Sequence, residues 1–388
     1  MFKATFEVLP FAFCLGAMAL FVRPARVGVR AQALWAAALA ACASKFLCFE
    51  ALGGDAFAPE LPEALIWTWG WAYSGMCILF ALAAAWQTLR LLSLRRLPKG
   101  RGLAWLVGLP LVAWTLAAAG VWNGLKAPRV VEVELSVAGL PESLDGYRIL
   151  QISDIHVSAA ATRRRTEAVV RLANAAAPDL VCLTGDYADG MPAAQAANVA
   201  PLKELRARDG IYAVTGNHEF YFDYRGWMDV FDGLGVRFLV NECAFPRPGL
   251  AVGGVEDPVG MQMLRPAPDT AAAFAAATNG EFRVLLQHRP WIDFEALGLP
   301  PDETPRDLQL SGHTHGGIAP GFASLIAKFN MGFVSGMYES AGPARRLYVS
   351  RGAGQWAGFP VRFFNDPEIA VFTLRRRQAR TAGARPPE

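Results

Sequence analysis

The chain has 388 residues, of which 53% are hydrophobic, and a formal net charge of +3 at pH 7. This length is enough for two or three domains with buried cores, and so small a charge gives no reason to expect a nucleic-acid partner. The charge is unevenly distributed: residues 1–125 contain ten Lys or Arg, only five Asp or Glu, and eight of the 11 tryptophans. We therefore expect a membrane region over residues 1–125, followed by a globular domain of ordinary soluble composition.

Four apolar segments of the membrane region reach or approach the roughly 20 residues that a membrane-spanning helix needs. They are Thr5–Val22, Ala31–Phe49, Ala64–Leu89 and Leu103–Trp122. The sequence thus predicts a four-helix transmembrane region, and the first segment is not a signal peptide, because it has few N-terminal cations and three more spans follow. Lys45 lies close enough to the end of its span for its ammonium to reach the membrane surface, so we expect anchoring and no transport path.

The loops between these segments predict the orientation of the chain. Residues 23–30 and 90–101, which connect the first span to the second and the third to the fourth, contain three and five Lys or Arg; the remaining connection has only acidic charges. Because Lys- and Arg-rich loops stay in the cytoplasm, we expect a multi-pass protein of the cell (inner) membrane whose soluble domain is extracytoplasmic. Lys126 and Arg129, just after the last span, weigh mildly against this orientation.

Beyond Val130 the pattern changes to short apolar runs that end in polar turns. Strand-like runs occupy 131–135, 147–152, 180–184, 211–214, 284–286, 308–310, 347–349 and 369–374, and helix-like runs occupy 163–177 and 201–208. Five of the strand-like runs lead directly into residues that can bind a metal. In sheets flanked by helices, ligands collect at the carboxyl ends of the strands, so we expect these residues to lie together.

Seven side chains at these strand ends are candidate metal ligands. They are Asp154, His156, Asp186, Asn217, His288, His313 and His315. Two carboxylates, an amide oxygen and four imidazoles suit a pair of divalent transition metals such as Mn, Fe or Zn, and suit calcium poorly, because calcium prefers an all-oxygen shell. Two such metals roughly 3.5–4 Å apart clamp a phosphoryl group and supply a hydroxide nucleophile.

The order of these residues along the chain is itself informative. Asp154-x-His156, Gly185-Asp186, Gly216-Asn217-His218-Glu219, His288 and Gly312-His313-Thr314-His315 resemble, in this order, the motifs of the calcineurin-like metallophosphoesterases, above all those of a membrane-attached bacterial branch. The resemblance extends from about Val130 to Leu374. It implies a four-layer α/β/β/α sandwich, in which helices flank two sheets and a dinuclear metal site lies at the edge.

The same resemblance implies a role for each residue. Asp186 would bridge two divalent metal ions. Asp154, His156 and His315 would complete the shell of one metal, and Asn217, His288 and His313 that of the other. His218 would be the catalytic residue that faces the substrate and protonates the leaving oxygen, and it would not bind a metal.

Structural alternatives exist for several of these residues. Asp154 and Asp186 are also common in turns and helix caps, and Asn217 in Asx-turns. His288, with little motif around it, can instead be a buried structural histidine. We expect Glu219 to have a structural role. The alternative is that it supports a metal-binding residue.

The sequence therefore predicts a membrane-anchored phosphoesterase that hydrolyses a phosphodiester or pyrophosphate bond by metal-activated hydroxide attack. We expect residues 1–125 to form the transmembrane region, 126–375 the metallophosphoesterase domain and 376–388 a disordered basic tail. The alternatives are a phosphomonoesterase of small soluble esters and a non-catalytic sensor of a phosphate ligand.

A lipid-linked substrate is one candidate, because the apolar segment Ile318–Phe329 follows the last motif. The segment either caps the core of the domain or forms an exposed apolar patch beside the metals. In the second case it would dip into the membrane interface and receive a lipid-borne phosphate.

Overall fold

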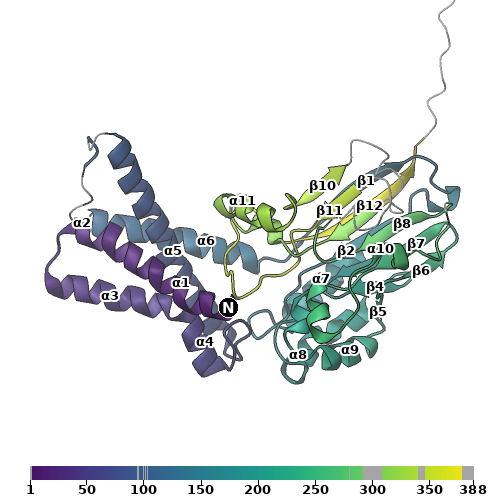
Figure 1. The fold of residues 1–388 in the computed structure, drawn as a ribbon, viewed down its shortest axis with the longest axis horizontal. Coiled ribbons are helices and arrows are strands. Elements are labelled where there is room, and N and C mark those ends of the chain that lie inside the picture. Colours follow the sequence, from purple (N-terminus) through teal and green to yellow (C-terminus); the bar gives the residue numbers. More distant parts are fainter. Residues whose placement is uncertain are drawn as a thin grey trace, which may run out of the picture.

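The computed structural model describes residues 2–93, 96–98, 104–278, 280–291, 308–339 and 346–377, together with Gly100 and Gly102. Within these residues the chain forms two adjoining parts, a group of apolar helices and a pair of β-sheets, and the N-terminus lies where they meet (Figure 1). Arg95, Lys99, Arg101 and Leu103, which belong to the last predicted loop and span, lie outside the described residues, as does the predicted tail beyond Arg377.

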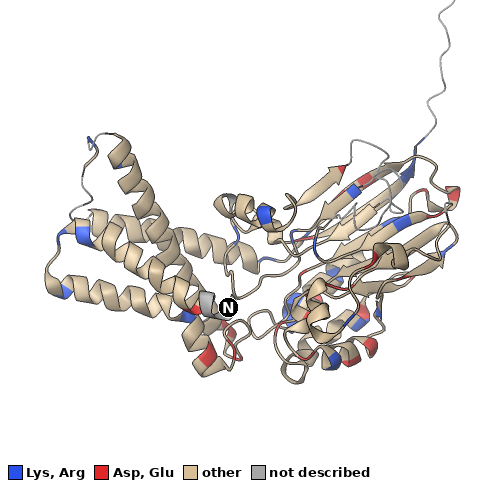
Figure 2. Ribbon diagram, viewed as in Figure 1, with Lys and Arg blue, Asp and Glu red and all other residues tan. Residues whose placement is uncertain are grey.

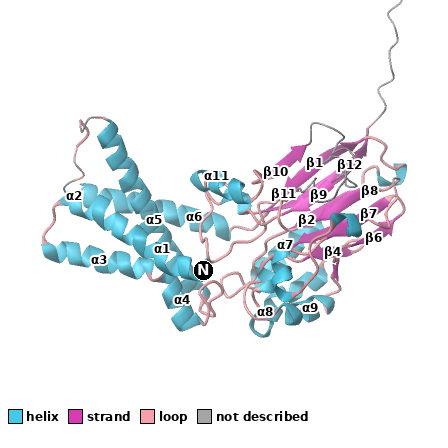
Figure 3. Cartoon of the chain, in the orientation of Figure 1, coloured by secondary structure: helices cyan, strands magenta, loops and turns pink. Residues whose placement is uncertain are grey.

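The apolar helices run back and forth beside one another (Figure 3). Their bounds are α1 (Phe2–Ala17), η1 (Met18–Val22), α2 (Arg23–Ala25), α3 (Val29–Ala43), α4 (Lys45–Gly53), α5 (Glu63–Leu92), η2 (Ala104–Gly108) and α6 (Leu109–Leu125). Phe21, Leu39, Met76 and Leu79 pack together at the centre of this group. Many other apolar side chains of these helices are exposed, which is what a bilayer would cover.

The number of membrane-spanning helices depends on how the second predicted span is counted. Three helical segments, Phe6–Ala25, Glu63–Leu92 and Ala104–Leu125, are long and apolar enough to cross a membrane, and the number rises to four if α3 and α4, which meet at 55°, form one span. The break lies at Ser44, whose hydroxyl donates to the Ala41 carbonyl at 2.9 Å, a bond that often accompanies bends in apolar helices.

Lys45 opens α4 directly after this break. Its side chain is fully buried. Its ammonium contacts the β-sheet part of the molecule, through the Ala357 and Gly358 carbonyls. The expectation that it reaches the membrane surface stays a prediction.

The remaining chain folds around two six-stranded sheets. The first has the order β1-β12-β2-β3-β4-β5, with β1 (Arg129–Val137), β12 (Glu368–Arg376), β2 (Arg148–Ile152), β3 (Leu180–Thr184), β4 (Ile211–Val214) and β5 (Arg237–Phe238). The second has the order β10-β11-β9-β8-β7-β6, with β10 (Gly336–Glu339), β11 (Arg346–Val349), β9 (Leu308–Ser311), β8 (Phe282–Leu286), β7 (Leu250–Gly254) and β6 (Glu242–Arg247). β12 includes Arg376, the first residue of the predicted tail.

The two sheets pack face to face through alternating apolar residues. Ile149, Leu180 and Val214 of the first sheet lie in one buried cluster with Val284 and Leu310 of the second. The central strands are buried along their whole length, as expected for strands covered on both faces. The predicted α/β fold with two sheets is therefore confirmed.

The outer faces of the two sheets are covered unequally. Helices α7 (Arg163–Ala175), α8 (Pro192–Val199) and α9 (Tyr224–Asp232) pack on the first sheet. On the second sheet, the outer apolar cluster contains the four-residue helix α10 (Thr270–Ala273). A complete fourth layer of helices stays a prediction, because residues 292–307 lie outside the described part of the chain.

One edge of this sandwich gathers the ends of several parallel strands. β2, β3 and β4 run parallel in the first sheet, and β7, β8 and β9 run parallel in the second. Their carboxyl ends face the helical part of the molecule (Figure 1). The predicted ligands follow five of these ends.

Candidate metal centre

The backbone turns sharply at the ends of β2, β3 and β9, three of the five strands that carry candidate ligands. Asp154, His156, Asp186, His313 and His315 all have positive φ, between 46° and 71°. Side chains other than glycine rarely adopt this left-handed region, at a cost of roughly 1–2 kcal/mol each. Such strain persists only where the surroundings hold it, and its concentration here indicates a functional site.

Hydrogen bonds between neighbouring strand ends hold these turns. Asp154 N donates to Gly185 O at 3.0 Å, and Gly312 N donates to His288 O at 2.8 Å. The two sheets are joined as well, because His313 N donates to Asp154 Oδ1 at 3.0 Å. The loops therefore form one network rather than independent turns.

Glycine is required where these loops approach one another most closely. Gly185 has φ +90°, and a Cβ at this position would lie 2.5 Å from Gly216 N and 2.7 Å from His288 Nδ1. A Cβ at Gly312 would overlap the Ser153 hydroxyl and the Asp154 carboxylate. The motif glycines thus let backbone and ligand side chains pack in contact.

Glu219 fixes the loop that carries Asp186. Its buried carboxylate accepts hydrogen bonds from Asp186 N (3.0 Å), Tyr187 N (2.7 Å) and Gly216 N (2.7 Å). Burial, together with the charge of Asp186, raises the pKa of Glu219 to about 7. This residue therefore supports the turn, in agreement with its predicted structural role.

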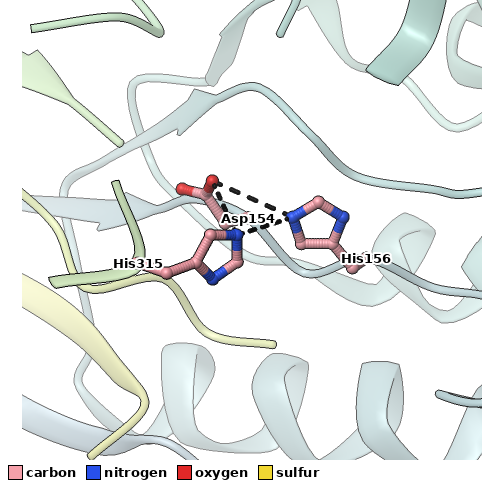
Figure 4. Close-up of side chains that lie close together, drawn as sticks. All are labelled: Asp154, His156 and His315. Atoms are coloured by element: carbon pink, nitrogen blue, oxygen red, sulfur yellow. Dashed lines mark hydrogen bonds and ion pairs between the residues drawn. The ribbon is translucent and has the colours of Figure 1, made fainter. Parts of the chain in front are cut away.

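The candidate ligands form two clusters. In the first, His315 Nε2 and His156 Nε2 lie 3.6 and 4.0 Å from Asp154 Oδ1, and the two rings approach to 3.0 Å between their Nε2 atoms (Figure 4). In the second, Asp186, His288 and His313 place their ligand atoms within 4.8 Å of one another. Each cluster combines one carboxylate with two imidazoles.

Asp186 lies between these clusters. Its Oδ2 is 3.2 Å from His288 Nε2 and 3.8 Å from His156 Nε2. Within the described residues, the ion pairs of the other predicted carboxylate, Asp154, are with ring nitrogens of the first cluster alone. The carboxylate of Asp186 is therefore within reach of both clusters.

The chemistry of the donors fits divalent metals. Asn217 is nearly fully buried, and its Oδ1 has no hydrogen-bond partner among the described residues, while its Nδ2 donates to Tyr221 Oη at 3.4 Å. A buried amide oxygen without a partner is costly unless a cation binds it. Carboxylates, imidazoles and this oxygen together match the ligand preferences of Mn, Fe and Zn.

The protonation states of the clusters follow from their geometry. Burial alone would raise the pKa of Asp186, but the neighbouring His288 and His218 rings hold it well below its usual value. Burial and a neighbouring histidine lower the pKa of both His313 and His315. Asp186 is therefore ionised and these two histidines are neutral, which are the forms that bind metals.

His288 shows the opposite shift. Burial opposes its charge, but contact with Asp186 raises the pKa of His288 to about 10. A metal ion that binds this imidazole would therefore displace a proton.

Asp189 is a buried residue of this site that the sequence analysis did not single out. Its carboxylate accepts from His156 Nδ1 at 3.1 Å and from His218 Nδ1 at 2.6 Å. These bonds leave both Nε2 atoms directed at the clusters, and carboxylates often orient metal-binding histidines in this way. Its position three residues after Asp186 was the available signal, but acidic residues are too common in loops to identify it.

Arg362 is a second such residue. It is buried, and its Nη2 lies 2.8 Å from His315 Nδ1. Because a guanidinium only donates hydrogen bonds, His315 Nδ1 is the acceptor in this contact. Arg362 belongs to the long β11–β12 loop, in which no sequence motif marks it.

Comparisons with known proteins agree with this geometry. A family model described as calcineurin-like phosphoesterase matches residues 147–317. Two relatives are named "Transmembrane protein with metallophosphoesterase domain". The one from Danio rerio is 32% identical, with 69% of this chain and 62% of that protein covered, and the one from Bos taurus is 32% identical, with 77% and 70% covered.

A bacterial relative shows a similar match. The "Uncharacterized metallophosphoesterase Cj0846" of Campylobacter jejuni is 30% identical over 264 residues, which cover 68% of this chain and 67% of that protein. The matched region thus spans between about three fifths and seven tenths of the lengths of these three relatives. With the ordered motifs and the strand-end clusters, these matches show that the chain belongs to the calcineurin-like metallophosphoesterases.

Proposed function

We propose that this chain is a membrane-anchored phosphoesterase that uses two divalent metal ions to hydrolyse a phosphodiester or pyrophosphate bond. The observation that carries the proposal is the position of Asp186 Oδ2, 3.2 Å from His288 Nε2 and 3.8 Å from His156 Nε2, between the two clusters. When bound, the metals supply Lewis acidity towards phosphoryl oxygens and a nucleophile at neutral pH.

The residues divide between the two metals as the family resemblance implies. Asp154, His156, Asp186 and His315 would hold one ion, and Asp186, Asn217, His288 and His313 the other. The separate clusters and the unpartnered oxygen of Asn217 support this division.

The surroundings of His218 support its proposed role as the acid. Asp189 binds its Nδ1 at 2.6 Å, and its Nε2 lies 3.9 Å from Asp186 Oδ2. The ring therefore has one nitrogen fixed by a carboxylate and the other directed towards the place where a phosphoryl group would bind. This arrangement lets Nε2 give a proton to the leaving oxygen.

The membrane part of the proposal rests on the layout of the helices. We propose that residues 1–125 anchor the enzyme, residues 126–375 form the catalytic domain, and residues 376–388 form a tail. Apart from Lys45, which contacts the sheet part, most Lys and Arg drawn on the helical part lie at the end away from the sheets (Figure 2). By the rule that cationic loops stay in the cytoplasm, the catalytic domain is then extracytoplasmic.

A lipid-linked substrate is the finer form of the proposal. The segment after the last motif forms α11 (Pro320–Phe329), in which Phe322, Leu325 and Phe329 are 53%, 47% and 73% exposed. These exposures favour the apolar patch over the alternative that the segment caps the core. Ile318 O, just before α11, accepts from Phe363 N at 2.9 Å, and the adjacent Arg362 N donates to Gly120 O of α6 at 3.0 Å, so α11 begins close to the membrane helices.

The test is a metal analysis of the purified full chain together with a phosphoester panel. We expect two equivalents of divalent metal, and chelator-sensitive turnover of a chromogenic phosphodiester that exceeds turnover of the matching monoester. Lipid-linked pyrophosphates in mixed micelles complete the panel. Faster monoester turnover would favour the small-ester alternative, and bound metal without any turnover would favour the sensor.

A further inference from the structure

A buried lysine joins the membrane region to the metal centre. Lys45 Nζ donates to Ala357 O at 2.6 Å and lies 3.4 Å from Gly358 O, more than 300 residues further along the chain. The ammonium also lies 4.1 Å from the centre of the Phe46 ring. A charge in a membrane helix is costly, so one that is fully buried and bonded to specific carbonyls indicates a function.

The two carbonyl acceptors directly follow Trp356. The Trp356 indole is only 9% exposed and meets the His218 ring edge to face, with 5.3 Å between ring centres. It also packs against Phe57, at 5.4 Å between ring centres, in the connection between α4 and α5. The membrane region thus supports the aromatic ring that touches His218.

The same β11–β12 loop, residues 350–367, is bonded to the rest of the site. Its backbone N–H groups at Ala353 and Gly354 donate to Ser153 O and Asp154 O, both at 2.8 Å. Arg362, which contacts His315, donates through its backbone N–H to Gly120 O of α6 at 3.0 Å. The loop therefore joins the ligand turns on one side to the membrane helices on the other.

We propose that Lys45 is a positioning residue of the phosphoesterase site. Its bonds to the Ala357 and Gly358 carbonyls hold Trp356 against His218 and so fix the imidazole in the orientation that protonates the leaving oxygen. The inference rests on the proposed function, since it assumes that His218 is the acid. It makes the membrane region a structural component of the active site as well as its anchor.

The variant Lys45→Met tests this role, because it keeps the long side chain and removes the donors. It is assayed as the full chain in detergent micelles with two phosphodiesters, one with a p-nitrophenyl and one with an alkyl leaving group. Only the alkyl alcohol needs a proton from the acid, so we expect its kcat to fall roughly tenfold, a fraction of a general-acid contribution. The kcat for the nitrophenyl ester, both KM values and the metal content should stay close to those of the wild type, and Lys45→Arg should restore alkyl turnover.

Control variants separate the possible failures. Gln87, whose Nε2 donates to Leu20 O at 3.1 Å inside the membrane region, gives the control Gln87→Leu, which should leave both kcat values unchanged. If His218→Ala itself does not discriminate between the leaving groups, the proposed acid is wrong. If His218→Ala discriminates but Lys45→Met slows both esters equally or neither, the positioning role is wrong.

The test does not depend on Lys45→Met reaching the membrane. If this variant does not accumulate, Phe57→Leu removes another contact of Trp356 with the membrane region and is assayed in the same way. If Phe57→Leu loses turnover of the alkyl ester selectively, the inference is supported. If both esters keep the same fraction of their wild-type rates, the inference is overturned.

Discussion

Asp186 is the residue on which the proposed dinuclear site depends. Its carboxylate contacts histidine rings of both clusters. We expect Asp186→Asn to lower the metal content and to abolish turnover, because an amide cannot bridge two cations as a carboxylate does. Metal analysis and a chromogenic phosphodiester assay on the same sample measure both effects.

The matched control for this change is Asp223→Asn. Asp223 caps α9 by accepting from Gly226 N at 3.2 Å, and Asn caps helices about as well. This variant should keep both metals and full turnover. Normal metal content and activity in Asp186→Asn would contradict the dinuclear site.

His218 belongs to a group with His156 and Asp189 that is itself compact enough to bind a metal. As the acid, it should be dispensable for metal binding. We expect His218→Ala to retain both ions and to lose roughly 10²–10⁴ in rate, the usual size of a general-acid contribution. Metal analysis beside kinetics distinguishes the two roles: loss of one metal equivalent would make His218 a ligand.

The sequence predicted which candidate ligands lie close together, but it predicted only some of the residues that hold them in place. Asp154, Asp186 and His313 each follow a buried strand, and parallel strands place their ends at one edge, so their proximity was predictable. Asp189 and Arg362 act through contacts across 33 and 47 residues of chain and lie in no motif. Such contacts arise from tertiary packing, which a local pattern does not contain.

At the scale of elements, the strands were easier to predict than the helices around them. Buried runs such as β3 and β9 appeared in the sequence because their residues are apolar on both faces. The break between α3 and α4 was missed because the segment is continuously apolar, and one hydroxyl bond at Ser44 accompanies the bend. The apolar composition of α11 was evident from the sequence. Its helical form and its exposure were not, because they depend on the segments that pack around it.

The apolar face of α11 gives a test at this scale. We expect replacement of Leu325, Ile326 and Phe329 together by Ser to reduce turnover of a micellar lipid-linked substrate and to leave a small soluble diester unaffected. Leu325 and Phe329 are 47% and 73% exposed, so the fold should lose little stability. Paired assays and a thermal melt measure the three quantities.

Phe245 of β6 supplies the control for this test. It is 47% exposed on an edge strand, and Phe245→Ser should change neither activity. If the triple variant loses activity on both substrates together with thermal stability, the segment belongs to the core and a lipid-linked substrate loses its main structural support.

At the scale of the whole molecule, the helical part and the sheets share an interface that the sequence did not predict. Besides Lys45, Trp67 Nε1 donates to Ala160 O at 2.8 Å, and Gln195 Nε2 donates to the Glu60 carboxylate at 2.8 Å. Partners this far apart in the chain are invisible to periodicity and composition. Their contacts place the strand ends, and therefore the metal centre, directly against the membrane helices.

This arrangement makes the orientation of the chain testable. The N-terminal helix and α6 both reach the sheets, since Phe6 packs on Trp356 at 6.3 Å between ring centres and Arg362 N donates to Gly120 O. Both ends of the membrane region therefore lie on the side of the catalytic domain, as an even number of crossings requires. That number is four when α3 and α4 act as one bent span.

Protease added to intact spheroplasts should then digest the chain beyond about Lys126, because the arginine-rich loops keep the opposite side in the cytoplasm. A cytoplasmic marker that survives the treatment shows that the membranes are intact, and immunoblotting with an antibody to the catalytic domain follows the cleavage. If the domain is protected until the cells are lysed, the catalytic site faces the cytoplasm. The positively charged loops at 23–30 and 90–101 would then lie outside the cytoplasm, contrary to the rule for such loops. The proposed localisation would be wrong.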